Sequence, residues 1–194
     1  VLRDRMSPQR QAEMRHAAHL LLANLSPGSP SDPTQWPRFQ VILPHAYASN
    51  VLECDDPWVR QLVIDLMVYL FFWGDHQESV ALGKSAMAAW SAKLEETDPQ
   101  LLQVAGLLGP YLCTLGRYAE AAELNQRTLA LRRQVSGDDS EETLSAQLSV
   151  AYDLKAKGDR LKKEEVPLED LEDKFQRNFR HIKGREGNAR GVSH

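Results

Sequence analysis

The sequence has little of what several large classes of protein require. It contains only two cysteines, Cys54 and Cys113, too few for a disulfide framework or a structural zinc site. Its most apolar run, residues 62–73, is interrupted by Asp65 and falls short of the roughly 20 residues that a membrane span needs. Lys and Arg total 23 against 27 Asp and Glu, with no basic block and no signal peptide. We therefore expect a cytoplasmic protein that binds neither nucleic acid nor membrane.

Motifs of catalysis are also missing. The sequence has no Gly-x-x-x-x-Gly-Lys-Ser/Thr loop, no Gly-x-Ser-x-Gly, no His-Glu-x-x-His and no Cys-x-x-Cys. Glu13, His16 and His19 follow one another at steps of three, a spacing that some metal-binding helices use, but no second helix offers completing ligands. We predict no enzymatic activity and no cofactor, and keep metal binding by these three residues as a less favoured alternative.

What the sequence does contain is an internal repeat. Gly74, Gly116 and Gly158 lie 42 residues apart, and Asp56-Pro57 and Asp98-Pro99 recur at the same interval. The Asp-Pro pairs are typical of helix starts, and the glycines are typical of helix ends because glycine enters the left-handed conformation cheaply. Apolar residues recur at helical spacing between them. This pattern predicts first helices over residues 60–72, 102–115 and 143–157, and second helices over residues 76–94 and 118–135.

Residues 115–123, with the sequence LGRYAEAAE, resemble the inter-helix signature of a tetratricopeptide repeat. The 42-residue period resembles the long-helix variant found in kinesin light chains. This resemblance implies an all-α fold, a right-handed superhelical array of antiparallel helix pairs, with a role in protein–protein interaction. In its register Gly109 and Ala151 stand where the two helices of a repeat cross closely. Met67 and Ser79 depart from it, because small residues are usual at their positions.

An irregular helical hairpin is predicted before the repeats, within residues 1–55. Residues 7–25 form its first helix, capped by Ser7, and residues 36–52 form its second, bent near Pro44. We expect the apolar face of the first helix to comprise Met14, Ala17, Ala18, Leu21, Leu22 and Leu25.

Residues 36–46 of this hairpin resemble the lead-in to the repeats of actinobacterial NB-ARC-type signal-transduction ATPases, including those associated with FxSxx-type peptides. That resemblance implies the sensor or scaffold arm of a larger signalling ATPase. Because the sequence begins at Val1, we take it as a piece whose ATPase part lies elsewhere.

The pattern changes after the repeats, which we divide as 56–97, 98–139 and a partial 140–159. In residues 160–194 a new apolar series appears at helical spacing, namely Leu168, Leu171, Phe175, Phe179 and Ile182. This series predicts a C-terminal amphipathic helix followed by a disordered end. The helix could cap the array, or dock on this or a neighbouring molecule and so produce a homo-oligomer.

The resemblance also implies a peptide-binding groove lined by the first helices. Its predicted residues are Gln61, Ile64, Val68, Phe71, Gln103, Gly106, Pro110, Ser145, Leu148, Tyr152 and Lys155. Lys155 is the only cation among them, so an apolar peptide or partner helix is the expected ligand. In the alternative interpretation, these apolar residues of the first repeat simply pack on the N-terminal hairpin: Ile64, Val68, Phe71 and Phe72.

Overall fold

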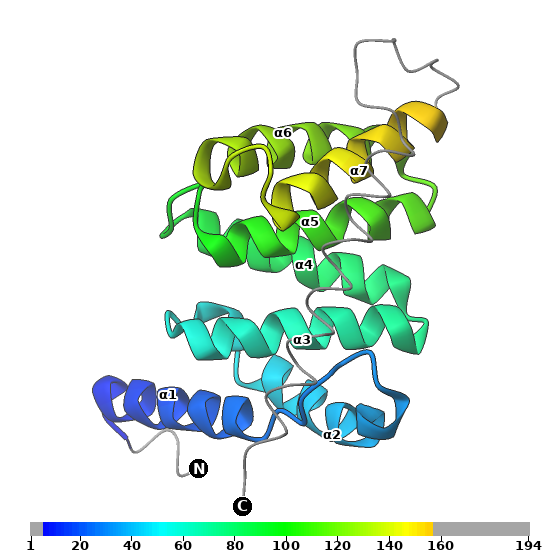
Figure 1. Cartoon of the computed structure of the whole chain (residues 1–194). Coiled ribbons are helices and arrows are strands. Elements are labelled where there is room, and N and C mark those ends of the chain that lie inside the picture. The colour runs from blue at the N-terminus through cyan, green and yellow to red at the C-terminus, as the bar shows by residue number, and fades with distance from the viewer. Residues whose placement is uncertain (1–5, 157–194) are drawn as a thin grey trace, which may run out of the picture. The chain divides into compact units, whose positions relative to one another are not determined.

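The computed structural model describes residues 6–156 and places no strand among them. Figure 1 shows an all-α array of stacked antiparallel helices, as predicted. The helices are α1 (Pro8–Asn24), α2 (Trp36–Ala48), α3 (Pro57–Trp73), α4 (His76–Ser91), α5 (Pro99–Thr114), α6 (Tyr118–Ser136) and α7 (Glu141–Ala156), with short 3-10 turns η2 (Pro33–Gln35) and η3 (Val51–Glu53). They fall into two compact units, Val1–Leu115 and Gly116–His194. The predictions for Gly158 and for residues 160–194 lie outside the described residues.

Side-chain caps and glycines delimit the helices as the repeat predicts. The Asp56 carboxylate accepts a hydrogen bond from the Trp58 backbone N–H at 2.8 Å, and the Asp98 carboxylate accepts one from Gln100 at 2.9 Å. Each satisfies a donor that the helix itself leaves free. Gly74 ends α3 at φ 101° and Gly116 follows α5 at φ 74°, both in the left-handed region that favours glycine. Two successive periods therefore have the same local signals.

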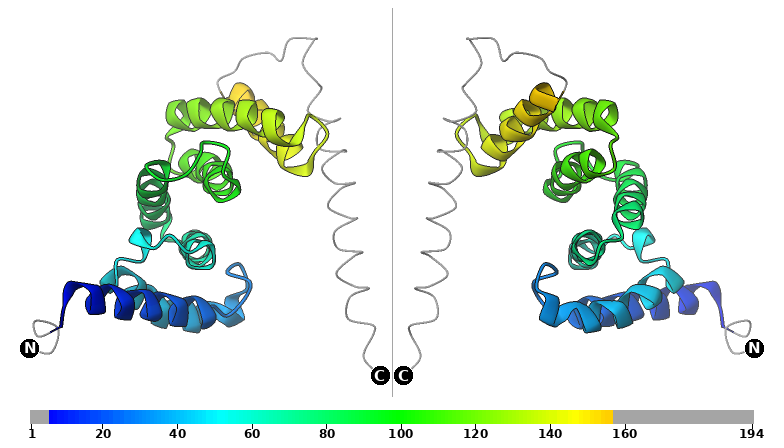
Figure 2. Two further views of the ribbon diagram at one scale, coloured as in Figure 1. Left: turned by 90° about the vertical axis from the view of Figure 1, so that its left-hand side faces the viewer. Right: turned by 90° about the vertical axis from the view of Figure 1, so that its right-hand side faces the viewer.

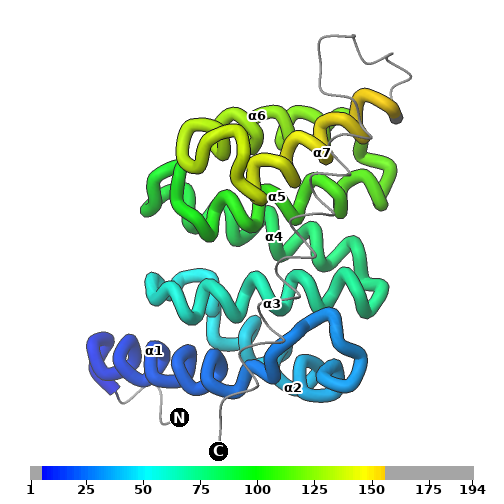
Figure 3. Tube along the Cα trace, viewed as in Figure 1, coloured from blue at the N-terminus to red at the C-terminus, as the bar shows by residue number. Residues whose placement is uncertain are grey.

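In unit 1, α4 packs against both α3 and α5, and these two helices lie side by side along it (Figure 2). On the other side of α3 lie α1 and α2. The core is large and apolar, and the Phe39 ring of α2 stacks on the Tyr69 ring of α3 at 5.2 Å. Both α2 and α5 are continuous helices (Figure 3), although Pro44 and Pro110 lie inside them.

The predicted apolar face of α1 is wrong. Met14, Leu21 and Leu25 are each at least half exposed, whereas α1 buries His19 and Ala23. Nε2 of the buried His19 imidazole lies 2.9 Å from the Ser49 carbonyl oxygen, which gives this ring nitrogen a hydrogen-bond partner. Because a histidine can be buried once it has such a partner, the face that α1 turns inward differs from the most apolar one.

The crossing of α3 and α4 explains the two departures from the repeat signature. Met67 is buried. A Cβ atom added to Gly83 would lie 2.8 Å from the Met67 sulfur and 2.9 Å from Leu108 Cδ2. Gly83 thus provides the space that Met67 occupies. Ser79 is also buried, and its hydroxyl donates to the Met67 carbonyl at 2.8 Å. Larger and more polar residues are accommodated here by a glycine and a hydrogen bond.

In unit 2, α6 packs against α7 through small apolar residues and one polar pair. The Asn125 amide donates to the Asp153 carboxylate at 2.8 Å, and both side chains are buried. Leu144 and Ala151 form the apolar part of α7, with Leu148 against them. In neither unit is a described helix long and apolar enough to cross a membrane.

Candidate functional site

In unit 1, α4 packs against both α3 and α5, and α1 and α2 pack against α3. Each of α3 and α5 still leaves one stripe of side chains partly or fully exposed. We call the two stripes together the α3/α5 face. It comprises Gln61, Asp65, Val68 and Phe72 of α3 with Gln103, Gly106 and Pro110 of α5.

Direct contacts at both ends of the α3/α5 face fix its two helices to each other. At the N-terminal end, Arg60 Nε donates to Gln100 Oε1 at 2.7 Å, and Gln100 Nε2 donates to the Pro57 carbonyl at 2.8 Å. At the C-terminal end, the Phe71 ring stacks on the Tyr111 ring with centroids 3.7 Å apart. Burial raises the pKa of Tyr111 to about 12, so this phenol stays neutral at physiological pH. The face is therefore braced at both ends.

The centre of the face is open on the α5 side and acidic on the α3 side. A Cβ atom built on Gly106 meets nothing within 4 Å, and Pro110 is exposed. On α3, Asp65 accepts hydrogen bonds from Gln61 Nε2 at 2.9 Å and from the Ser26 hydroxyl at 3.3 Å. Burial raises the pKa of the Asp65 carboxyl, because both hydrogen-bond donors are neutral and only partly compensate the lost hydration.

Most of the groove residues predicted for unit 1 lie on this face, and two do not. On this face Gln103, Gly106 and Pro110 are exposed, and Gln61 and Val68 are partly exposed. Ile64 is only 1% exposed, so the prediction that it lines the groove is wrong.

Phe71 is held against Tyr111 of α5, so its ring packs on the next repeat. Sequence reasoning missed Asp65 as a residue of this face. Its position, four residues after Gln61 and three before Val68, was the available signal.

In unit 2, the predicted residues form one stripe along α7. Ser145, Tyr152 and Lys155 are exposed, with Tyr152 46% accessible, whereas Leu148 is half-buried. Leu148 packs against Leu144 and Ala151, so it contributes to the core of unit 2 as well as to its surface. This stripe carries a cation, whereas the α3/α5 face carries an acid.

The alternative metal site is not assembled in unit 1. Glu13 pairs with Arg10 at 3.3 Å, His16 Nδ1 lies 3.6 Å from the Cys54 sulfur, and His19 is buried against a backbone carbonyl. The three side chains therefore have three different partners. Within residues 6–156, no three His, Cys, Asp or Glu side chains lie close enough to hold a metal ion.

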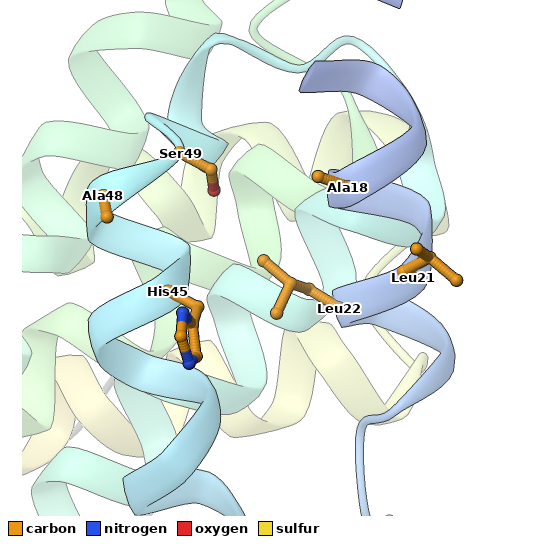
Figure 4. Close-up of a pocket in the computed structure, with 6 residues that line it drawn as sticks. All are labelled: Ala18, Leu21, Leu22, His45, Ala48 and Ser49. Carbon is orange, nitrogen blue, oxygen red and sulfur yellow. The ribbon is translucent and has the colours of Figure 1, made fainter. Parts of the chain in front are cut away.

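A surface pocket that the sequence did not predict lies between α1 and α2. Its volume is about 380 Å³. Figure 4 shows its lining, which is mostly apolar and comprises Ala18, Leu21, Leu22, His45, Ala48 and Ser49. Together with the exposed Met14 and Leu25, it gives the outer side of α1 an apolar character.

One protein-family model matches the middle of the chain. Residues 68–134, from α3 to α6, match the family model described as tetratricopeptide repeat. The matched segment is thus similar to tetratricopeptide repeats, which typically mediate protein–protein interactions.

Two solved structures are similar to the chain. BtubC (BKLC) from P. vanneervenii is 11% identical with a TM-score of 0.52, covering 97% of this chain and 94% of that one. The TPR-like repeats of a Podosopora anserina candidate kinesin light chain are 18% identical with a TM-score of 0.49, covering 93% and 88%. The first of these likenesses supports the fold alone. No curated protein matches the chain.

Proposed function

We propose that this chain binds another polypeptide, and that a peptide or a partner helix lies along the α3/α5 face. The observation that carries the proposal is the open space above Gly106 on a pair of helices that are braced at both ends. A surface that is already ordered loses little conformational entropy on binding. The amides of Gln61 and Gln103 can pair with peptide backbone, while Val68 and Pro110 offer apolar contact.

The α7 stripe is a second proposed binding surface, separate from the α3/α5 face. Tyr152 offers an aromatic side chain of the kind enriched where partners bind, and Lys155 adds a positive charge beside it. Because this stripe belongs to unit 2, it is tested separately from the α3/α5 face.

The wider role that we propose is that of a non-catalytic, cytoplasmic sensor or scaffold arm of a larger signalling ATPase. Its support is the resemblance of residues 36–46 to the lead-in of such proteins, together with the tetratricopeptide repeats that follow. The full-length protein would then carry the ATPase, and the repeats would receive the partner.

Blocking the face tests the binding proposal directly. A random peptide library is selected on the whole chain, and the affinity of an enriched peptide is measured by fluorescence anisotropy. Gly106→Tyr should abolish binding, because the new ring occupies the open space above α5 while the helix remains intact. Ala81→Tyr, which adds the same ring to an exposed position of α4, is the matched control and should bind normally.

Two further results complete the test. Tyr152→Ala should weaken peptides that bind the α7 stripe and leave those that bind the α3/α5 face unaffected. Equal binding by Gly106→Tyr and the unmodified chain would contradict the proposal for the α3/α5 face.

A further inference from the structure

We infer that the α3/α5 face selects a peptide segment in which one Lys or Arg is flanked by apolar side chains, and that Asp65 contacts the cation. This inference rests on the proposed function and adds the chemistry of the partner to it.

The first step concerns the charge of the face. α5 contains no charged residue, and α3 contains only Arg60 and Asp65. Arg60 is 8% exposed and is committed to Gln100 and to the Asp55 carbonyl, 2.8 Å from its Nη1. Asp65 is therefore the single charged side chain that the two helices present at this face. A partner of complementary charge is positive at one point only.

The second step concerns what Asp65 lacks. Its partners among the described residues, Gln61 and Ser26, are uncharged donors that occupy two of roughly four acceptor positions of a carboxylate. No cation compensates its partial burial within residues 6–156. A guanidinium or ammonium group placed against it would form a charge-assisted hydrogen bond, which is shorter and stronger than those that it makes now. The same carboxylate would repel an acidic peptide.

The third step concerns the surroundings of the carboxylate. Val68 lies three residues after Asp65, and Phe72 lies four residues after Val68, along the same stripe. Phe72 is 51% exposed. Long cationic side chains lay their methylene stems on apolar surface while the charged end reaches its partner. Apolar residues next to the cation can use Val68, Phe72 and the open side of Pro110. The acid and the apolar surface thus favour one mixed sequence rather than a purely apolar one.

The experiment compares selections from the random peptide library on three forms of the whole chain: unmodified, Asp65→Asn and Asp65→Lys. Peptides enriched on the unmodified chain should share one Lys or Arg beside apolar residues. Asp65→Lys should enrich peptides with Asp or Glu at that position. For one synthetic peptide, Asp65→Asn should weaken binding about tenfold, a difference of about 1.4 kcal/mol. Added salt should weaken binding to the unmodified chain more than to Asp65→Asn.

The controls separate charge from folding. Asp139→Lys makes the same charge change at an exposed position of unit 2 and should leave the selection unchanged. Circular dichroism checks that each variant keeps its helices, and Asp65→Asn, nearly identical in shape to the native residue, answers the question if Asp65→Lys does not fold.

The outcomes distinguish this inference from the proposed function. Peptides that lose binding in Gly106→Tyr, but lack a cation and tolerate Asp65→Asn, would overturn the inference and leave the proposed function standing. A library that yields no peptide, or only peptides that bind Gly106→Tyr equally well, would overturn both. A cationic consensus that changes sign with Asp65→Lys supports both.

Discussion

The helix pair α4 and α5 of unit 1 and the pair α6 and α7 of unit 2 occupy the same place in the repeat and are packed by different chemistry. Gly83 of α4 and Asn125 of α6 are 42 residues apart, and so are Tyr111 of α5 and Asp153 of α7. In unit 1 the glycine admits Met67 and Leu108, and Tyr111 stacks on Phe71. In unit 2 the same two positions carry the hydrogen-bonded pair Asn125 and Asp153.

This difference shows that the repeat conserves a backbone arrangement and not a particular set of contacts. Close apolar packing is non-directional and tolerates repacking, whereas a buried amide–carboxylate pair is stable only while both partners are present. We therefore expect unit 2 to respond more severely than unit 1 to a single substitution at the equivalent position.

The largest effect is expected for Asn125→Leu. It removes the amide that donates to the buried Asp153 carboxylate at 2.8 Å, and should cost about 2–3 kcal/mol of unfolding free energy. Urea denaturation followed by circular dichroism measures this loss.

Tryptophan fluorescence shows which unit unfolds in that measurement. All four tryptophans, Trp36, Trp58, Trp73 and Trp90, lie in unit 1. The circular dichroism transition should consequently move to lower urea than the fluorescence transition.

Two controls support this interpretation. Gln126→Leu, at the exposed neighbouring position of α6, should change stability by less than about 0.5 kcal/mol. Adding Asp153→Leu to Asn125→Leu should restore part of the loss, because replacing both members of a buried polar pair removes the unmatched group. Additive losses in the double variant would contradict a role for the pair.

The second prediction tests the glycine of unit 1. In Gly83→Val, the new side chain meets the Met67 sulfur and Leu108 at distances below 3 Å, and overpacking should cost about 2 kcal/mol. Combining it with Met67→Ala should cost less than the sum of the two single changes, since the valine then enters the vacated space. Denaturant titrations of the three variants measure this coupling, and independent losses would exclude the proposed contact.

Local signals made most of the fold predictable from the sequence. Asp56, Asp98 and Gly74 act within one turn of the chain, so their roles as caps and helix ends could be inferred without knowing what packs where. The helix positions and the all-α class followed from these signals together with the apolar spacing.

Features that depend on distant partners were predicted less well. The prediction of the inward face of α1 was wrong because His19 becomes buried only once the Ser49 carbonyl is available. The local sequence does not indicate the partners of Asp153 and Asp65, because Asn125 and Ser26 lie 28 and 39 residues away in the chain. Polar residues at buried helix positions are uninformative in a sequence because their partners lie elsewhere in the chain.

A smaller effect, of opposite sign, is expected for Gly106→Ala. A glycine inside a helix destabilises it by about 0.5–1 kcal/mol relative to alanine, and nothing within 4 Å opposes a methyl group here. The melting temperature should therefore rise. Gly83→Ala has the same intrinsic gain but meets Met67 and Leu108, so its stability should rise less. A decrease for Gly106→Ala would show that the space above α5 is filled.

The smallest effect concerns the pH dependence contributed by Asp65. Burial raises the pKa of this carboxyl in the folded chain above its ordinary value of 3.8. The folded state therefore binds the proton more tightly than the unfolded state. This contribution to stability is fully present below the unfolded pKa and is lost as the pH rises through the folded pKa. In Asp65→Asn it is absent at every pH.

The measurement is the difference in unfolding free energy between Asp65→Asn and the unmodified chain, taken from acid to neutral pH. That difference should shift in favour of the variant as the pH rises. The exposed substitution Asp139→Asn should show no such shift. A bound cationic peptide should reduce the shift for Asp65, because the cation stabilises the ionised carboxylate and draws its pKa back down. The same titration thus measures how much unfolding free energy the ionised, partly buried Asp65 removes, and how much of it a cationic peptide restores.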